Sequence, residues 1–182
     1  GCTMVLKPAS QTPFSALALA ELAIRAGIPA GVFNVVTGSA GAVGNELTSN
    51  PLVRKLSFTG STEIGRQLME QCAKDIKKVS LELGGNAPFI VFDDADLDKA
   101  VEGALASKFR NAGQTCVAPD YLLVHRDLKE GLCREMKHAV GEFFGDYPLR
   151  SPAYPRIVSE RATARLAGMI GASGRVLWGG EF

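Results

Sequence analysis

The sequence predicts an α/β fold, in which a parallel sheet with helices on both faces is followed by the start of a second α/β domain. Two observations support this prediction. Between residues 3 and 92, short apolar runs of strand length alternate with longer segments of helical periodicity. Such alternation is typical of parallel strands joined by helices that cover both faces of the sheet. A group of acidic residues after Phe92 then begins a second region that is richer in helix.

The first region contains signals for where its helices begin and end. Pro13 suits the first turn of a helix and Gly27 can end it, so that residues 13–26 are expected to be helical. The expected order is strand 3–6, helix 13–26, strand 33–36, a short helix that Gly38 and Gly41 open and that runs through Leu47, strand 56–58, helix 61–73, strand 79–83 and strand 89–92.

The second region begins with the carboxylates of Asp93, Asp94 and Asp96, which suit a helix N-terminus because they accept from free N–H groups and complement the helix dipole. The boundary is expected near residues 84–88, where two glycines and a proline permit a turn, which gives domains 1–85 and 86–182. The expected elements are helix 97–108, strand 121–124, helix 128–144, a loop with three prolines at 146–155, helix 160–170 and a last strand 176–178.

Composition limits the classes of function. The chain has 20 basic and 19 acidic residues, a balance that indicates neither nucleic acid nor a membrane as a partner. No apolar run is long enough to span a bilayer. The four cysteines form no Cys-x-x-Cys pair and fit neither a zinc site nor a disulfide framework. We therefore expect no metal site, and free thiols in a reducing, cytoplasmic setting.

Two residues are candidates for covalent chemistry. Cys116 ends the small-residue segment from Asn111, in which Gly113 permits tight geometry and the N–H of Cys116 is available to a developing oxyanion. Glu82 lies at the end of an apolar run and would act as a base near neutrality if buried. The alternatives are a buried structural cysteine and a glutamate on the polar face of a half-exposed strand. A nucleophile with a base is the minimum for covalent acyl transfer.

Two further segments are candidates for a dinucleotide. Gly60 and Ser61 lie between a strand and a helix, where free N–H groups attract phosphate; the alternative is an ordinary turn with a helix N-cap. Lys7 lies at the carboxyl end of a strand, where ligands bind in open α/β sheets; the alternative is a solvated lysine. Ser10 carries no charge that would repel a 2′-phosphate, which makes NADP admissible beside NAD.

Taken together, these motifs resemble the aldehyde dehydrogenase superfamily, and they occur in that family's order along nearly the whole chain. The matching stretches are Lys7 to Pro13, Gly31 to Val36, Phe58 to Gly65, Leu81 to Asn86 and Asn111 to Cys116.

The resemblance implies a Rossmann-like NAD(P)-binding sheet and a mechanism. Cys116 attacks the aldehyde and forms a thiohemiacetal, hydride transfer leaves a thioester, and Glu82 activates the water that hydrolyses it to the carboxylic acid. The cofactor NAD or NADP is implied to contact the remaining site residues, which are Lys7, Ser10, Gly60, Ser61, Ile64 and, through its backbone, Leu83.

The resemblance is closest to the succinate-semialdehyde dehydrogenase branch over residues 1–117, which makes succinate semialdehyde a candidate substrate. Later residues look more like the branch for fatty and aromatic aldehydes, as in a hybrid. Since family members are much longer and the ends look cut, we expect a segment of a longer enzyme, with little turnover alone. The full-length enzyme is expected to be a homo-oligomer.

Three alternatives stay open at this point. A CoA-acylating or phosphorylating relative would release a different product, although the presence of Glu82 favours hydrolysis. A structural or nucleotide-binding fragment would use the fold without chemistry. A dinucleotide-dependent oxidoreductase without covalent catalysis would not need Cys116.

Overall fold

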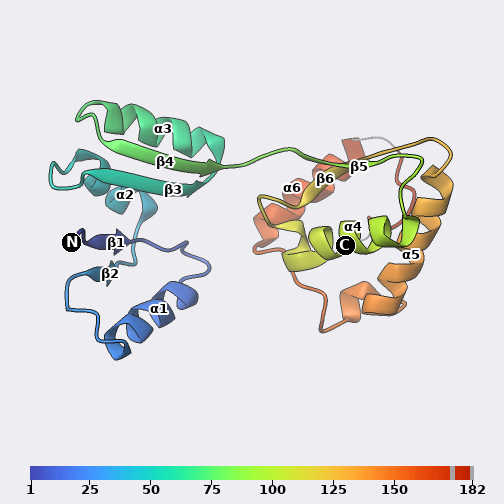
Figure 1. Cartoon of the computed structure of the whole chain (residues 1–182), viewed down its shortest axis with the longest axis horizontal. Coiled ribbons are helices and arrows are strands. Elements are labelled where there is room, and N and C mark those ends of the chain that lie inside the picture. The colour runs from blue at the N-terminus through green and yellow to red at the C-terminus, as the bar shows by residue number, and fades with distance from the viewer. Residues whose placement is uncertain (173–174, 181–182) are drawn as a thin grey trace. The chain divides into compact units, whose positions relative to one another are not determined.

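The structure, a computed structural model, describes residues 1–172 and 175–180. The chain divides into two compact units, Gly1–Gly84 and Gly85–Phe182, called unit 1 and unit 2 below (Figure 1). Each unit combines helices with parallel strands, so the predicted α/β class is confirmed. The assignment of residues 1–85 to cofactor binding and of residues 86–182 to catalysis stays a prediction.

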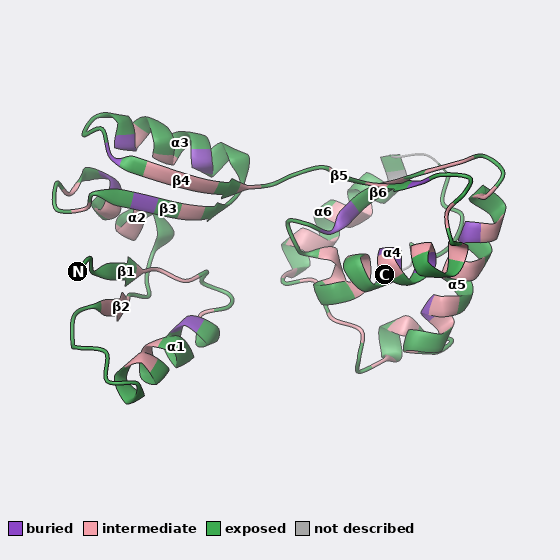
Figure 2. Cartoon of the chain, in the orientation of Figure 1, coloured by how far each residue is buried: buried purple, intermediate pink, exposed green. Residues whose placement is uncertain are grey.

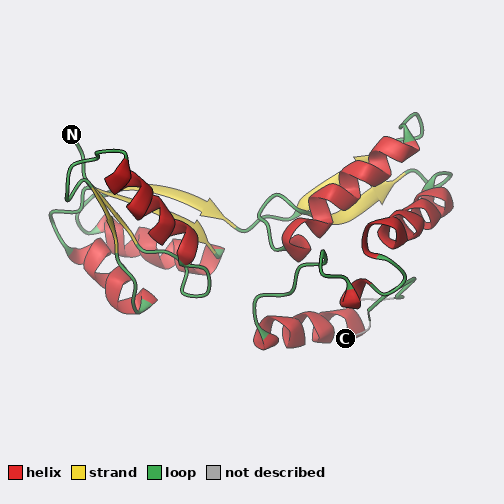
Figure 3. Ribbon diagram, turned by 90° about the horizontal axis from the view of Figure 1, so that it is seen from below, coloured by secondary structure: helices red, strands yellow, loops and turns green. Residues whose placement is uncertain are grey.

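Unit 1 alternates strands and helices in the predicted order. Its strands form two parallel pairs, β1 with β2 and β3 with β4, and all of them run in the same direction (Figure 1). Figure 3 shows α1 on one side of these strands and α2 and α3 on the other. The elements are β1 (Met4–Leu6), α1 (Phe14–Arg25), β2 (Phe33–Val35), α2 (Ala40–Ser49), β3 (Lys55–Gly60), α3 (Thr62–Ala73) and β4 (Lys78–Leu83).

The sequence predicts one parallel sheet, whereas the strands of the structure form separate pairs. Among the described residues, the pair β1–β2 has no ladder hydrogen bonds to the pair β3–β4, and β5 pairs only with β6. Alternation along the sequence predicts the parallel direction of strands joined by helices. It does not determine which strands lie next to each other, because adjacency depends on contacts between residues far apart in the chain.

A buried lysine fastens the amino end of the β3–β4 pair. The side chain of Lys77 is only 2% exposed, and its Nζ lies 3.6 Å from the carboxylate of Asp75. The same Nζ donates to the carbonyl oxygens of Asn50 at 2.7 Å and Val53 at 2.9 Å. These three partners satisfy the three donors of the ammonium, which is the condition for burying such a charge without a large penalty.

Unit 2 is built around two packed helices. Buried Val101 and Leu105 of α4 meet buried Leu132 and Val140 of α5 and form its core, shown in purple in Figure 2. Asp96 caps α4 by accepting from the N–H of Lys99 at 3.2 Å, as its position in the sequence predicts. The elements are β5 (Ala87–Val91), α4 (Leu97–Phe109), the 3-10 turn η1 (Arg110–Gly113), β6 (Pro119–Val124), α5 (Lys129–Phe144), the 3-10 turn η2 (Pro148–Arg150) and α6 (Glu160–Ala172).

The prediction of a last strand at residues 176–178 is wrong. These three apolar residues adopt no strand, and each is about half exposed. A strand requires a partner for its backbone groups, and none of the strands in the described part of the chain pairs with this segment. Among residues 1–172 and 175–180, no helix has the length and apolar character needed to cross a membrane.

Candidate active site

The residues expected to bind a cofactor lie at the carboxyl edge of the strands of unit 1. Lys7 follows β1, Gly60 ends β3 and Leu83 ends β4. In the parallel register of β3 and β4, Gly60 lies beside Leu83 and Thr59 lies beside Glu82. Parallel strands that run in one direction end at one edge, and this edge is the usual ligand-binding side of an open α/β sheet.

A cavity of about 270 Å³ brings Lys7 and Ser10 together at this edge. The Nζ of Lys7 donates to the carbonyl of Pro8 at 2.8 Å, which holds the ammonium close to the loop after β1. Thr37 and Gly38, which follow β2, complete the wall of the cavity. Neither residue was predicted, although a position just after a parallel strand is a signal that could have indicated them. The cavity is lined by Lys7, Pro8, Ala9, Ser10, Pro13, Thr37 and Gly38.

Ser61 has the structural role that the sequence left open. It is the N-cap of α3, and its Oγ accepts from the N–H of Ile64 at 3.3 Å. Gly65, in the first turn of α3, is buried where an added Cβ would overlap the side chain of Leu83. The missing side chain at residue 65 therefore lets α3 pack directly against the Leu83 side chain of β4.

Glu82 is exposed on β4, whereas Leu81 and Leu83 on either side of it are partly buried. Of the two positions that the sequence left open for Glu82, the polar face of a half-exposed strand is therefore the one observed. The reason is the strand alternation itself, since successive side chains point to opposite faces. An exposed carboxylate is accessible to water and to ligands, so a role for Glu82 in hydrolysis stays a prediction that does not depend on burial.

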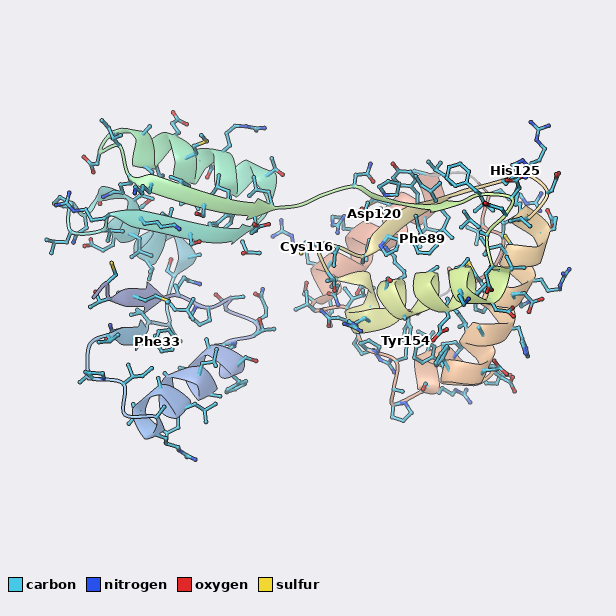
Figure 4. The ribbon with its side chains drawn as sticks, viewed as in Figure 1. Phe33, Phe89, Cys116, Asp120, His125 and Tyr154 are labelled. Carbon is cyan, nitrogen blue, oxygen red and sulfur yellow. The ribbon has the colours of Figure 1, made fainter. Side chains whose placement is uncertain are left out.

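Cys116 is exposed in the loop between η1 and β6, where Figure 4 labels it. The alternative of a buried structural cysteine does not describe it. That description fits Cys72, which is fully buried in α3. Burial raises the pKa of the Cys72 thiol, with the nearby Lys77 ammonium acting in the opposite direction. The two thiols thus differ in access, and only the exposed one is available to attack a substrate.

The turn before Cys116 has an unusual backbone. Asn111, Ala112 and Gly113 are consecutive residues with φ values of 54°, 52° and 74°. This left-handed region is uncommon for residues with a side chain, and for alanine it stores strain. Strained backbone of this kind concentrates at functional sites. A Cβ at Gly113 would also lie 3.1 Å from the Cε of Lys108, so a side chain there would be crowded.

Gln114 holds this turn through its side chain. Its Nε2 donates to the carbonyl oxygens of Asn111 at 3.0 Å and Arg156 at 3.2 Å, and its Oε1 accepts from the N–H of Val158 at 2.9 Å. Sequence reasoning missed this residue. Its partners at positions 156 and 158 lie more than 40 residues further along the chain, and no local pattern signals such a contact.

Asp120 fixes the other end of the loop, at the start of β6 (Figure 4). Its Oδ2 accepts from the N–H of Ala87 at 2.9 Å, and its Oδ1 lies 4.0 Å from the Nζ of Lys108. Close by, Gly85 lies against the backbone of Cys116, since an added Cβ would be 3.8 Å from the Cys116 carbonyl oxygen. The loop is therefore held on both sides of the sulfur, and Asp120 was also missed from the sequence.

The segment that receives Gln114 is itself anchored. The guanidinium of Arg156 donates to the carbonyl oxygens of Tyr154 and Leu149. The ring of Tyr154 meets the ring of Phe144 edge-on, with centroids 5.1 Å apart. Phe144 in turn packs against Phe109 at the end of α4, with centroids 5.7 Å apart. The hydrogen bonds of Gln114 thus connect the Cys116 loop to a packed aromatic cluster.

Glu82 belongs to unit 1 and Cys116 to unit 2. Each is exposed within its own unit, as two groups that act on one substrate must be before that substrate binds. Their meeting across one opening stays a prediction.

Comparisons with known proteins point to one family along nearly the whole chain. A model of the aldehyde dehydrogenase family matches residues 1–180. The chain is 70% identical, over its full length, to succinate-semialdehyde dehydrogenase [NADP(+)] GabD of Escherichia coli strain K12, and it covers 39% of that protein. Over 78% of its length it is 75% identical to a glutarate-semialdehyde dehydrogenase of Pseudomonas aeruginosa, of which it covers 29%.

A solved structure shares the fold as well. The crystal structure of an E. coli NADP dependent enzyme superposes with a TM-score of 0.91 at 67% identity, covering 99% of this chain and 38% of that one. The chain therefore spans less than two fifths of the relatives it matches. These matches do not test the shift in likeness after residue 117, which stays a prediction.

Proposed function

The chain belongs to the aldehyde dehydrogenase family, and we propose that it is the part of an NAD(P)-dependent enzyme that carries the nucleophile, the hydrolytic base and a portion of the cofactor site. The enzyme oxidises an aldehyde to a carboxylic acid. The observation that carries the proposal is the exposed Cys116 sulfur on a strained turn that Gln114 and Asp120 hold in place. A surface cysteine without a function needs no such support.

The cofactor is NAD or NADP, and the residues at the carboxyl edge of unit 1 suit it. The cavity of about 270 Å³ beside Lys7 and Ser10 has room for a polar group such as a ribose, with an ammonium available to its hydroxyls. Ser10 is uncharged and does not repel a 2′-phosphate, which agrees with the NADP(+) in the name of the E. coli relative. Gly60, Ser61 and Ile64 surround the N-terminus of α3, which favours the pyrophosphate, and the backbone of Leu83 would contact the nicotinamide carboxamide, as the family resemblance implies.

The reaction begins when the Cys116 thiolate adds to the aldehyde carbon. A new carbon–sulfur bond forms, the carbonyl oxygen becomes an oxyanion, and the N–H of Cys116 donates to it. NAD or NADP, held by the residues at the carboxyl edge of unit 1, would supply the hydride acceptor, and loss of a hydride from that carbon turns the oxyanion into the carbonyl of a thioester. The loop contributes by holding the sulfur in one orientation toward the substrate. Good orientation of the reacting atoms lowers the activation free energy by a large amount.

Glu82 completes the cycle by taking a proton from water. The resulting hydroxide adds to the thioester carbon, the carbon–sulfur bond breaks, and the carboxylic acid leaves while Cys116 returns as the thiolate. Exposure of Glu82 on β4 gives the carboxylate access to this water. General base catalysis of this kind accelerates a step by about 10²- to 10⁴-fold.

The substrate is a semialdehyde, and succinate semialdehyde is the first candidate. The names of the E. coli and P. aeruginosa relatives, which act on succinate and glutarate semialdehyde, support this class at 70% and 75% identity. The full-length enzyme is a homo-oligomer and works in a reducing compartment such as the cytoplasm. The exposed free thiols Cys2, Cys116 and Cys133 suit such a setting.

The test is a hybrid protein in which residues 1–182 replace the matching segment of the E. coli relative. The hybrid is expected to convert succinate semialdehyde to succinate with reduction of NADP. With Glu82→Gln, one equivalent of reduced cofactor should form rapidly and turnover should then stall with an acyl group on Cys116, detected by mass spectrometry.

Two results would contradict the proposal. Loss of the rapid phase in Glu82→Gln would show that Glu82 acts before the thioester forms. Release of acyl-CoA or acyl phosphate, when CoA or phosphate is added, would favour a relative that does not hydrolyse its thioester.

A further inference from the structure

We propose that Gln114 is a positioning residue for Cys116, and that it does so by tying the strained turn before the cysteine to the segment 156–158. The inference rests on the proposed role of Cys116 as the nucleophile. It assigns to Gln114 no contact with substrate or cofactor. Gln114 acts only through the backbone that carries the sulfur.

The side-chain amide of Gln114 is engaged at both ends. Its two N–H donors reach the carbonyl oxygens of Asn111 and Arg156, and its oxygen accepts from the N–H of Val158. The Asn111 bond closes the turn locally, and the other two cross to a distant segment. This combination makes Gln114 the link between the turn and the rest of unit 2.

The turn needs such a link because its own backbone does not favour its shape. Asn111 and Ala112 both hold positive φ values, a conformation that persists only where the surroundings determine it. Asn111 adds a bond from its Nδ2 to the Gln114 carbonyl at 3.3 Å. Beyond the turn, the N–H of Ala118 donates to the carbonyl of Thr115 at 3.0 Å and closes the loop around Cys116. Without the Gln114 side chain, the strained turn would lose its connection to a fixed partner.

The partner is suited to the task, because it is immobilised independently of Gln114. Arg156 is held by carbonyl acceptors at Tyr154 and Leu149, and Tyr154 packs against Phe144, which belongs to α5. The hydrogen bonds of Gln114 to Arg156 and Val158 therefore hold the exposed loop in a fixed position relative to the packed helix α5. A sulfur at the end of such a loop is presented in one orientation, whereas a sulfur on a free loop samples many.

The experiment uses the 182-residue chain and needs no turnover. The second-order rate of alkylation by iodoacetamide is measured for Cys116 and, in the same sample, for the exposed Cys133, by peptide mass spectrometry over a range of pH. In the parent chain we expect Cys116 to react faster than Cys133. Gln114→Ala removes three side-chain hydrogen bonds; since the net value of one ordinary hydrogen bond already corresponds to a population change of about fivefold, Cys116 should react at least about fivefold more slowly, and Cys133 should be unchanged.

Two further variants separate positioning from general damage. Gln67→Ala removes an exposed glutamine from α3 of unit 1 and should alter neither rate. Gln114→Glu keeps the size and the acceptor for the Val158 N–H, but it replaces both donors with an oxygen that faces two carbonyls, so it should slow Cys116 as Gln114→Ala does. It is the variant of choice if the alanine substitution does not fold, as judged by circular dichroism.

Hydrogen exchange supplies the structural readout. The N–H of Val158 should exchange faster in Gln114→Ala, because it loses its acceptor. If that exchange quickens while the rate and pH profile of Cys116 stay unchanged, the positioning role is overturned and the proposed function stands. If Cys116 reacts no faster than Cys133 in the parent chain, the proposed nucleophile fails and the inference falls with it.

Discussion

The carboxyl edge of unit 1 and the Cys116 loop of unit 2 place functional groups by different means. At the edge, the position of each group follows from where a regular strand or helix ends, as for Lys7 after β1, Gly60 at the end of β3 and Ser61 at the start of α3. In the loop, the backbone is irregular, and side chains such as Gln114 and Asp120 hold it through hydrogen bonds to distant residues.

The difference concerns tolerance to change. A group at the end of a strand keeps its place as long as the strand exists, so single side chains nearby contribute little. A group on a strained loop depends on each of its few supports. We therefore expect substitutions around Cys116 to alter its reactivity, and similar substitutions at the edge of unit 1 to alter stability and cofactor binding while the reactivity of Cys116 stays the same.

The largest effect is expected from Cys116→Ser. In the hybrid protein with the E. coli relative, this change should lower aldehyde oxidation on the order of 10³-fold or more, because a serine hydroxyl without a strong base is a poor nucleophile. Cys133→Ser is the matched control, since Cys133 is also exposed in unit 2, and it should retain full activity. Equal losses of activity in both variants would show that Cys116 has no special role compared with another exposed cysteine of unit 2.

The next effect concerns the core of unit 2, the region that contains the Cys116 loop. Leu132 is 2% exposed and lies in the core between α4 and α5, so Leu132→Ala should lower the free energy of unfolding of unit 2 by about 3 kcal/mol. Leu52→Ala, at a leucine that is 84% exposed in unit 1, should change it by less than about 0.5 kcal/mol. Urea denaturation followed by circular dichroism measures both, and similar losses would contradict the described core.

A smaller effect is expected at the edge of unit 1. Ser61→Ala removes the acceptor for the N–H of Ile64 and should cost about 1 kcal/mol of stability, the usual value of an N-cap. Ser61→Asp keeps an acceptor and should cost less. Neither change should alter the alkylation rate of Cys116, and a change in that rate would break the proposed separation between the two regions.

The smallest effect concerns the N-cap of α4. Hydrogen bonds from the Lys99 side chain and backbone hold the pKa of Asp96 below its usual range. A lowered pKa in the folded state stabilises the protein above the usual carboxyl value, and this contribution is lost as pH falls through the folded value. The difference in Tm between the parent and Asp96→Asn should therefore be largest near about pH 7, begin to shrink as pH falls below about 5, and vanish only below the lowered pKa of the folded state. A Tm difference that stays constant over this pH range would show that it arises from packing and not from the charge of Asp96.

Much of the fold follows from sequence because its signals are local. Pro13, Gly27 and Asp96 mark helix ends where the structure has them. The pairing of strands into separate two-stranded sheets was not predictable, because adjacency is a long-range property. Residues 176–178 have strand-like composition, but composition supplies no pairing partner, so that prediction was wrong.

The candidate site divides in the same way. Cys116 and Lys7 could be selected because residue type and position relative to an element suffice to indicate a chemical role. Whether Glu82 is buried or lies on the polar face of its strand stayed open, since an apolar run does not specify which face of a strand is covered. Gln114 and Asp120 were missed because their importance comes only from partners at positions 156, 158 and 87.

Because Cys72 is fully buried, alkylation of its sulfur reports transient opening of unit 1. An alkylating reagent reaches this sulfur only when α3 separates from the strands beneath it. A long labelling time course should therefore record the exposed thiols first and, much later, the rate at which unit 1 transiently unfolds. One reagent and one spectrum would then measure both reactivity at the surface and the lifetime of the native state.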